Sequence, residues 1–371
     1  MKQTIRSAGI VLGLVGVTLT TPTEAQDLEL DIIHVGIKDT EKVLQAYLEP
    51  FANILGSDLN AGWYNTARPH KLGGLDVTFT GNVSWAPASM LTYDVAELGL
   101  EKAVLSSGST SSVAPTITGD QDNRPGLTIS EEVALPDGST VEVPLLPEPI
   151  ILPNGTGIDF FPLPMGQLTV GLPLGTDVSA RFFPMLSIGD VGEIGMWGVG
   201  GKHSISQWIP FIKKVKILDV AVQGGYTKVS SELNIGVEPP DVEIAGEDYD
   251  HDGQSLGLDV AGWTVNLIAS QKLSIFTFYE GIGYASSLVN MDLSGPFPIP
   301  AVIVDDTDPL NPLAQTTWEV YDDPIDLNYS NINNLRINVG IRIKVSVLTL
   351  HYDFTHTLYS THSAGIGISF N

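Results

Sequence analysis

Residues 335–347 constrain the fold of this chain more than any other segment. They read LRINVGIRIKVSV, with an aliphatic side chain at every odd position and a polar, charged or glycine residue at every even one. A period of two predicts a β-strand with one apolar and one polar face. Strands of soluble proteins usually have about 5–6 residues, whereas a tilted strand needs about 9–11 to cross a bilayer. Because cations occupy the polar face, we expect a barrel wall with lipid outside and water inside.

The N-terminus has the features of an export signal. Lys2 and Arg6 precede an apolar run over residues 8–19, and residues 23–25 (TEA) offer small side chains at positions −3 and −1 of a cleavage site. The apolar run is too short for a transmembrane helix. We therefore expect residues 1–25 to be a signal peptide that directs the chain to the outer membrane of a Gram-negative-type bacterium.

Composition narrows the class of protein further. The formal net charge is −25, which argues against nucleic acid as a partner because its phosphates are bound by Lys and Arg. Charged residues make up 16% of the chain and the mean hydropathy is +0.15. Such a chain is too polar for a helical membrane protein but typical of strands that are half hydrophilic. The sequence contains no cysteine, so disulfides and a lipid-attachment cysteine are excluded.

The alternation recurs along the chain, and the strands it predicts are joined by two kinds of connection. Long, acidic or proline-rich connections occupy 86–165, 232–254 and 291–332, while the links near Leu174, Gln271 and Leu348 are short. Single-chain barrels keep short turns on the periplasmic side and long loops outside. Residues 73–371 are therefore expected to form a monomeric, antiparallel, all-β transmembrane barrel of about ten strands, or about twelve if an additional hairpin forms within the first long connection.

Residues 26–72 form a separate N-terminal segment with one helical stretch, over 37–62. One helical face carries four apolar side chains: Val43, Leu44, Tyr47 and Phe51. Pro50 is expected to kink this helix or to start a second one. The stretch is too short and too polar to span a membrane, so we expect a periplasmic helix that plugs the adjacent mouth of the barrel.

Several blocks of sequence together resemble an uncharacterised family of outer-membrane β-barrel proteins, known as a domain of unknown function. The blocks are YLEPF at 47–51, LNAGWYNTARPHKLGGLD at 59–76, residues 171–183, GVGGKHSISQWIP at 198–210 and SAGIGISF at 363–370. The resemblance covers most of the chain and implies the fold and the outer-membrane location, but no activity. A more distant analogy is with transporters of hydrophobic compounds, whose N-terminal segment plugs the barrel.

Cations on the polar face of 335–347 are the first candidate site. Arg336, Arg342 and Lys344 share that face, and cations in a lumen need counter-charges. Asp353 and Asp219 are the expected partners. Two interpretations remain open: structural ion pairs across the wall, or a cationic patch that sets the selectivity of a pore.

A second candidate is the cluster of Trp63, Tyr64, Asn65 and His70, just ahead of the first strand. These side chains could line the periplasmic mouth or the path of an apolar ligand. The alternative is ordinary packing between the N-terminal plug and the wall of the barrel.

Residues 248–253 (DYDHDG) match the first half of a calcium-binding loop, with Asp248, Asp250 and Asp252 as ligands and Asp259 at the closing position. Three hard carboxylate oxygens beside a turn at Gly253 suit calcium. The alternative is a solvated acidic surface loop, because the flanking helices of such sites are missing. No other cofactor is expected.

The last residues, 364–370, alternate again and place an aromatic side chain, Phe370, at the penultimate position. Such strands are recognised by barrel-assembly machinery, which is therefore the expected partner during biogenesis, alongside outer-membrane lipid. No GxSxG or HExxH motif is present, so we do not expect an enzyme.

Two functions remain open at this point. The barrel could bind or pass a small solute, including an apolar one, and the many small residues at inward positions favour a lumen that holds something. Alternatively, the barrel is a structural or surface-interaction protein with a filled lumen and acidic loops that bind cations.

Overall fold

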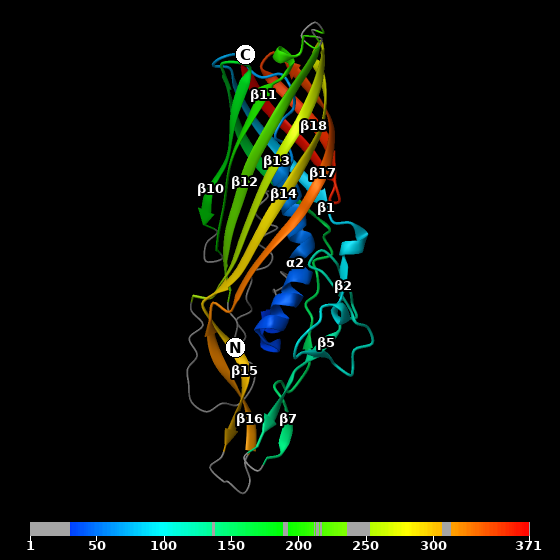
Figure 1. Ribbon diagram of the computed structural model, residues 1–371, viewed down its shortest axis with the longest axis vertical. Helices are drawn as coiled ribbons and strands as arrows, with labels where there is room; N and C mark the ends of the chain where they lie inside the picture. The colour runs from blue at the N-terminus through cyan, green and yellow to red at the C-terminus, as the bar shows by residue number, and fades with distance from the viewer. Residues whose placement is uncertain are drawn as a thin grey trace, which may run out of the picture.

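The computed structural model describes residues 30–135, 138–187, 192–210, 212, 215, 217–235, 253–305 and 313–370. Its main body is a closed antiparallel barrel in the order β1-β19-β18-β17-β14-β13-β12-β11-β10-β9, which confirms the ten-strand prediction (Figure 1). The strands of the barrel are β1 (Leu75–Trp85), β9 (Phe160–Leu172), β10 (Thr176–Ser187), β11 (Gly192–Ser204), β12 (Leu218–Asn234), β13 (Ser255–Leu273), β14 (Phe276–Ser294), β17 (Ile325–Val345), β18 (Leu348–His356) and β19 (Thr361–Phe370). The barrel closes where β1 pairs with both β19 and β9.

The two faces of the wall follow the alternation in the sequence. On the odd face of β17, Leu335 is 65% exposed and Val339 is 52% exposed. On the even face, Arg336 and Arg342 are buried, with exposed fractions of 3% and 6%. Apolar side chains are exposed around the outside of the barrel, including Phe79, Phe182, Val199 and Ile366. An apolar outer band around a polar interior is the arrangement of a transmembrane barrel. Among the described residues, no helix has the length and apolar character needed to span a membrane.

The two mouths of the barrel differ in their connections. At the short-turn mouth, β9–β10, β13–β14 and β17–β18 are joined by tight turns, with Leu174, Ser274 and Ser346 in the left-handed region of φ. Only the β11–β12 connection, which contains η4 (Ser206–Trp208), is longer there. The chain termini of the barrel, at Leu75 and Phe370, also lie at this mouth.

The opposite, long-connection mouth carries a head built from residues 86–159 and the hairpin of β15 (Pro296–Asp305) and β16 (Leu313–Asp322) (Figure 1). The first part of the head contains η2 (Ala88–Met90), β2 (Thr92–Asp94), η3 (Val95–Glu97), β3 (Val104–Leu105), β4 (Val113–Pro115), β5 (Gly126–Thr128), β6 (Ser130–Ala134), β7 (Thr140–Pro144) and β8 (Ile150–Ile151). These strands form small sheets of their own, so the additional barrel hairpin considered for 91–99 and 127–135 does not form.

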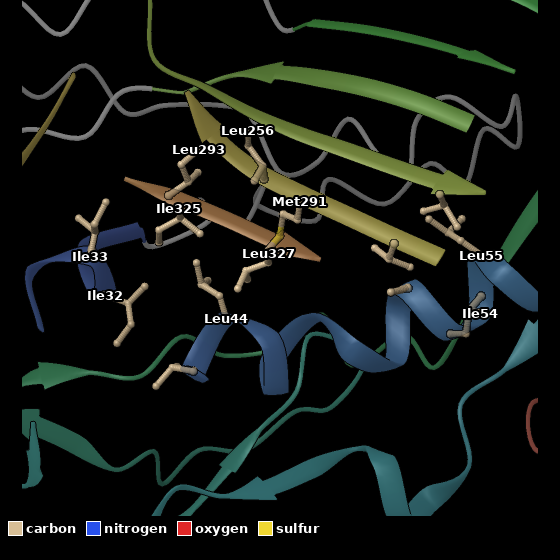
Figure 2. Close-up of a cluster of buried hydrophobic side chains, with 14 of the residues drawn as sticks. Ile32, Ile33, Leu44, Ile54, Leu55, Leu256, Met291, Leu293, Ile325 and Leu327 are labelled. Carbon is tan, nitrogen blue, oxygen red and sulfur yellow. The ribbon is translucent and has the colours of Figure 1, made fainter. Parts of the chain in front are cut away.

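The N-terminal segment contains η1 (Leu30–Val35) and a single helix, α2 (Ile37–Asn60). Pro50 lies inside α2, so it does not start a second helix. Leu44 on the predicted apolar face belongs to one buried cluster with Met291 at the end of β14 and Leu327 at the start of β17 (Figure 2).

This packing corrects the predicted position of the helix. We expected α2 at the periplasmic mouth, together with the short turns, but it enters the barrel through the long-connection mouth (Figure 1). The apolar ends of β14 and β17 lie at that mouth, and the apolar helix face is buried against them. The period of the helix reveals which face is apolar but not where its partner lies.

Candidate functional site in the barrel lumen

The C-terminal end of α2 lies inside the barrel and is held by arginines from opposite parts of the wall. Arg181 on β10 donates hydrogen bonds to the carbonyl oxygens of Leu59 and Ala61, at 3.0 and 2.8 Å. Arg336 on β17 donates to the carbonyl oxygen of Asn60. The last carbonyls of a helix lack partners within the helix and carry its partial negative charge. The two guanidinium groups therefore satisfy and neutralise this end of α2.

Neutral side chains of β1 complete the hold on the helix. Asn82 donates to the carbonyl oxygen of Asp58 at 2.8 Å, and the hydroxyl of Ser84 donates to the Asp58 carboxyl group at 2.6 Å. Asn82, Ser84 and Asp58 are all fully buried. The helix end is thus fixed to at least three strands of the wall.

Beyond the C-terminal end of α2, toward the short-turn mouth, aromatic side chains fill the lumen where the wall is lined by glycine. A Cβ atom at Gly200 would lie 2.6 Å from Trp63 Cζ3, and one at Gly225 would lie 2.7 Å from Cδ2 of the same ring. The Arg181 guanidinium lies 3.7 Å from the centre of the Trp63 ring, in a cation–π contact. Tyr64 packs edge-on against Tyr279 of β14, with ring centroids 6.1 Å apart. The small inward residues noted in the sequence therefore make room for the chain's own N-terminal segment.

At the short-turn mouth, charged side chains of the wall hold the end of this segment. His70 Nδ1 lies 3.1 Å from Asp177 Oδ2, and the His70 backbone N–H donates to Asp177 Oδ1 at 2.9 Å. Lys202 Nζ also lies 3.1 Å from Asp177 Oδ2. Asp76 lies 3.6 Å from the other ring nitrogen of His70 and 3.4 Å from Arg342. We refer to His70, Asp76, Asp177, Lys202 and Arg342 as the mouth cluster.

The structure gives Arg342 and Lys344 partners other than those expected, whereas Arg336 does interact electrostatically with Asp353. Arg342 pairs with Asp76 rather than with Asp353, and Lys344 donates to the carbonyl oxygen of Ser369 at 3.0 Å. Asp353 accepts hydrogen bonds from Tyr279 at 3.0 Å and Asn338 at 2.7 Å. Asp219 pairs with Arg68, at 2.8 Å.

The sequence interpretation missed Asp76, Asp177, Arg181 and Lys202. Asp76 lies on the polar face of a strand whose alternation was recognised, and that position was the available signal. The other three lie in segments that were recognised only as glycine-rich strands, without assignment of their faces. Of the second candidate cluster, Trp63, Tyr64 and His70 are buried against the wall, and Asn65 lines a luminal cavity beside them.

That cavity measures about 30 Å³, which is room for a few water molecules at most. Its walls include Trp63, Asn65, His70, Lys202 and Gln223. A solute of ordinary size does not fit in this cavity while the N-terminal segment stays in place, and the larger hollow of about 260 Å³ beside Glu193, Asp259 and Asp292 lies toward the long-connection mouth.

The calcium prediction is largely untested. Asp248, Asp250 and Asp252 lie outside the described residues, and Asp259 is part of β13, where it pairs with Lys228 at 2.8 Å. Within the described ranges, no group of three or more His, Cys, Asp or Glu is placed to hold a metal ion.

Solved structures similar to this chain include outer-membrane barrels. The translocator domain of the autotransporter NalP from Neisseria meningitidis shares 8% identity over 91% of this chain and 99% of that one, with a TM-score of 0.26. The transport unit of the autotransporter AIDA-I from Escherichia coli shares 8% identity over 88% of this chain and 99% of that one, with a TM-score of 0.27. The outer-membrane protease OmpT from Escherichia coli shares 10% identity over 80% of this chain and 97% of that one, with a TM-score of 0.24.

Similarity of this degree says nothing about activity, and the fold described above rests on the strand pairing itself. Among curated proteins, none matches this sequence. A family model described as a family of unknown function, DUF6588, matches residues 1–370. The chain, which forms a closed barrel around its own N-terminal segment, is therefore a member of the DUF6588 family.

Proposed function

We propose that this protein is an outer-membrane barrel with a filled lumen, whose role is to anchor the head at the cell surface. The observation that carries the proposal is the use of the luminal cations. Arg181 and Arg336 hold the end of α2, and Arg342 and Lys202 belong to the mouth cluster. No cationic patch of the described lumen is left to select a passing ion.

The charge of the head supports this role. The three long connections on the side of the long-connection mouth (86–159, 235–254 and 295–324) hold more than half of the 43 acidic residues of the chain. They contain only two basic residues, Lys102 and Arg124. An acidic head suits contact with cations or with a cationic partner at the surface, and single-chain barrels direct their long connections outward.

The proposal is tested by conductance of the purified protein in planar bilayers. We expect the wild type to conduct little. Replacing both Arg181 and Arg336 by Ala removes the donors that hold the helix end, so we expect frequent opening. Deletion of residues 26–72 should give steady conductance. Arg124→Ala is the matched control, because Arg124 also donates to a backbone carbonyl, that of Leu152 at 2.9 Å, but in the head.

A wild type that conducts as well as the double variant would contradict the proposal. It would favour the other function considered from the sequence, a barrel that binds or passes a small solute. Ion selectivity measured on that wild type would then report on the luminal cations.

A further inference from the structure

The N-terminal segment runs through the barrel from one mouth to the other. It starts in the head, where η1 packs against β15 and β8. Ile32 and Ile33 of η1 lie in the same buried cluster as Leu293 and Ile325 (Figure 2). This cluster is the apolar core of the long-connection mouth.

The middle of the segment lies halfway down the lumen. Asn60, the last residue of α2, donates to the carbonyl oxygen of Ser286 at 3.2 Å. Ser286 is near the centre of β14 (Phe276–Ser294), opposite Trp263 of β13.

The end of the segment reaches the short-turn mouth. Gly73 donates to the carbonyl oxygen of Gly171 at 2.9 Å, and Gly171 donates back to Gly74 at the same distance. Gly171 is the penultimate residue of β9, directly before the β9–β10 turn. Residues 61–74 therefore cover the distance from the middle of the lumen to this mouth, with bends and a turn but without helix or strand.

We propose that residues 37–74 are a tether threaded through the lumen, with η1 (Leu30–Val35) on the same side of the membrane as the head. This tether crosses the membrane once in addition to the ten strands. The two ends of the described chain, Leu30 and Phe370, then lie on opposite sides of the membrane. Together with the proposed orientation of the head, η1 lies on the cell-surface side.

The contacts explain why the tether does not slide or reverse. Its head end is held by the apolar core around Leu44, and the helix end by Arg181 and Arg336. Its far end is held by the mouth cluster through His70. Moving the segment along the barrel axis breaks all three sets of contacts at once.

The chain contains no cysteine, so single-cysteine variants report on one position each. Three exposed positions test the threading: Lys38→Cys at the start of α2, Ser107→Cys in the head and Leu174→Cys in the β9–β10 turn. The Lys38 side chain is 72% exposed, and Leu174 is 75% exposed. Intact cells are treated with a membrane-impermeant maleimide, and the same reaction is repeated after the outer membrane is opened.

We expect Lys38→Cys and Ser107→Cys to be labelled on intact cells, and Leu174→Cys only after opening. Labelling of Lys38→Cys together with Leu174→Cys, in the compartment opposite to Ser107→Cys, would overturn the threading. If Lys38→Cys and Ser107→Cys are both protected while Leu174→Cys reacts, the threading stands and the proposed orientation of the head is wrong.

Two further measurements keep the test decisive. Each variant is checked for the slower or faster gel migration of an unheated, folded barrel, and Gln45→Cys, also exposed on α2, replaces Lys38→Cys if that variant does not fold. An epitope followed by a protease site, inserted directly ahead of Leu30, should be released by protease added to intact cells. An epitope that stays protected until the outer membrane is opened, while Ser107→Cys is labelled from outside, would contradict the proposal.

Discussion

The two ends of the tether are held by opposite kinds of interaction. In the head, the first half of α2 is buried by apolar side chains, with Val43 and Leu44 nearly inaccessible. In the lumen, the end of α2 and residues 61–74 are held by guanidinium groups, carboxylates and amides. One continuous segment thus passes from an apolar core into a lumen where polar contacts surround the packed rings of Trp63 and Tyr64.

The two kinds of interaction differ in how strictly they fix the position of the N-terminal segment. Apolar packing is non-directional and tolerates changes that conserve volume. Buried polar groups must each be satisfied, so they fix one position of the segment and penalise all others. We infer that the head supplies much of the holding free energy and that the lumen sets the register of the tether.

The largest expected effect is at the mouth cluster. Arg342→Ser leaves Asp76 buried without its guanidinium partner, and breaking a buried pair in this way costs about 3–5 kcal/mol. Urea unfolding of the protein in lipid vesicles measures the loss. Arg68→Ser is the control at the same mouth, because the side chain of Arg68 is 46% exposed and its pair with Asp219 is worth at most about 1 kcal/mol. Equal losses would mean that water screens the mouth cluster and that this end is no more specific than the surface.

A smaller loss is expected in the apolar core of the head. Leu44→Ala removes a side chain that is 2% exposed, and such truncations cost about 3 kcal/mol. Because no charge is involved, the loss should be the same at low and high salt. Gln45→Ala, the exposed neighbour, should change the free energy of unfolding by less than about 0.5 kcal/mol. A salt-dependent loss for Leu44→Ala would erase the distinction between the two ends.

One polar contact in the head sharpens the comparison. The Asp39 carboxylate, in the first turn of α2, accepts hydrogen bonds from the backbone N–H groups of Glu101, Lys102 and Ala103, at 2.6, 2.9 and 2.7 Å. Asp39→Asn removes the charge and one acceptor, and we expect a loss of about 2 kcal/mol. Glu101→Gln, which alters only the solvent-accessible pairs with Lys38 and Lys42, should cost less than about 1 kcal/mol. Thermal unfolding of both variants decides whether the head is held by apolar packing alone.

The smallest expected effect concerns the fit of the tether in the lumen. Gly225→Ala places a methyl group against the Trp63 ring, and overpacking of this kind costs about 1 kcal/mol or somewhat more. Gly81→Ala is the matched control, because a Cβ at Gly81 meets no atom within 4 Å. The accompanying increase in bilayer conductance should be seen only for Gly225→Ala. A neutral Gly225→Ala would show that Trp63 is free to move and that the lumen is loosely filled.

Much of the barrel could be predicted from local pattern. The alternation at 335–347 identified β17 and its lipid-facing side, and the lengths of the connections gave the ten-strand topology. A period of two depends only on neighbouring residues, so the two faces of a strand can be identified from local sequence before the strand it pairs with is known. The hairpin of β15 and β16 was not anticipated, because 291–332 was interpreted as a single long connection.

The luminal site could be predicted only in part. The sequence alone identified Arg336 and Arg342 as inward cations and Trp63, Tyr64 and His70 as side chains of a plug, because inward positions and a short helix are visible in local sequence. Their partners were not visible. Arg342 meets Asp76 more than 250 positions away in the chain, a contact that exists only because β1 closes the barrel.

The sequence by itself determined the class of fold, the orientation of each strand's faces and the existence of an N-terminal helix with one apolar side. The tertiary structure alone decided which mouth that helix enters, and therefore that the tether begins on the same side of the barrel as the head. The physical reason is that an apolar face is satisfied by any apolar partner. Only the closed barrel and its head place such a partner at the long-connection mouth, and only there do Arg181 and Arg336 meet the end of the helix.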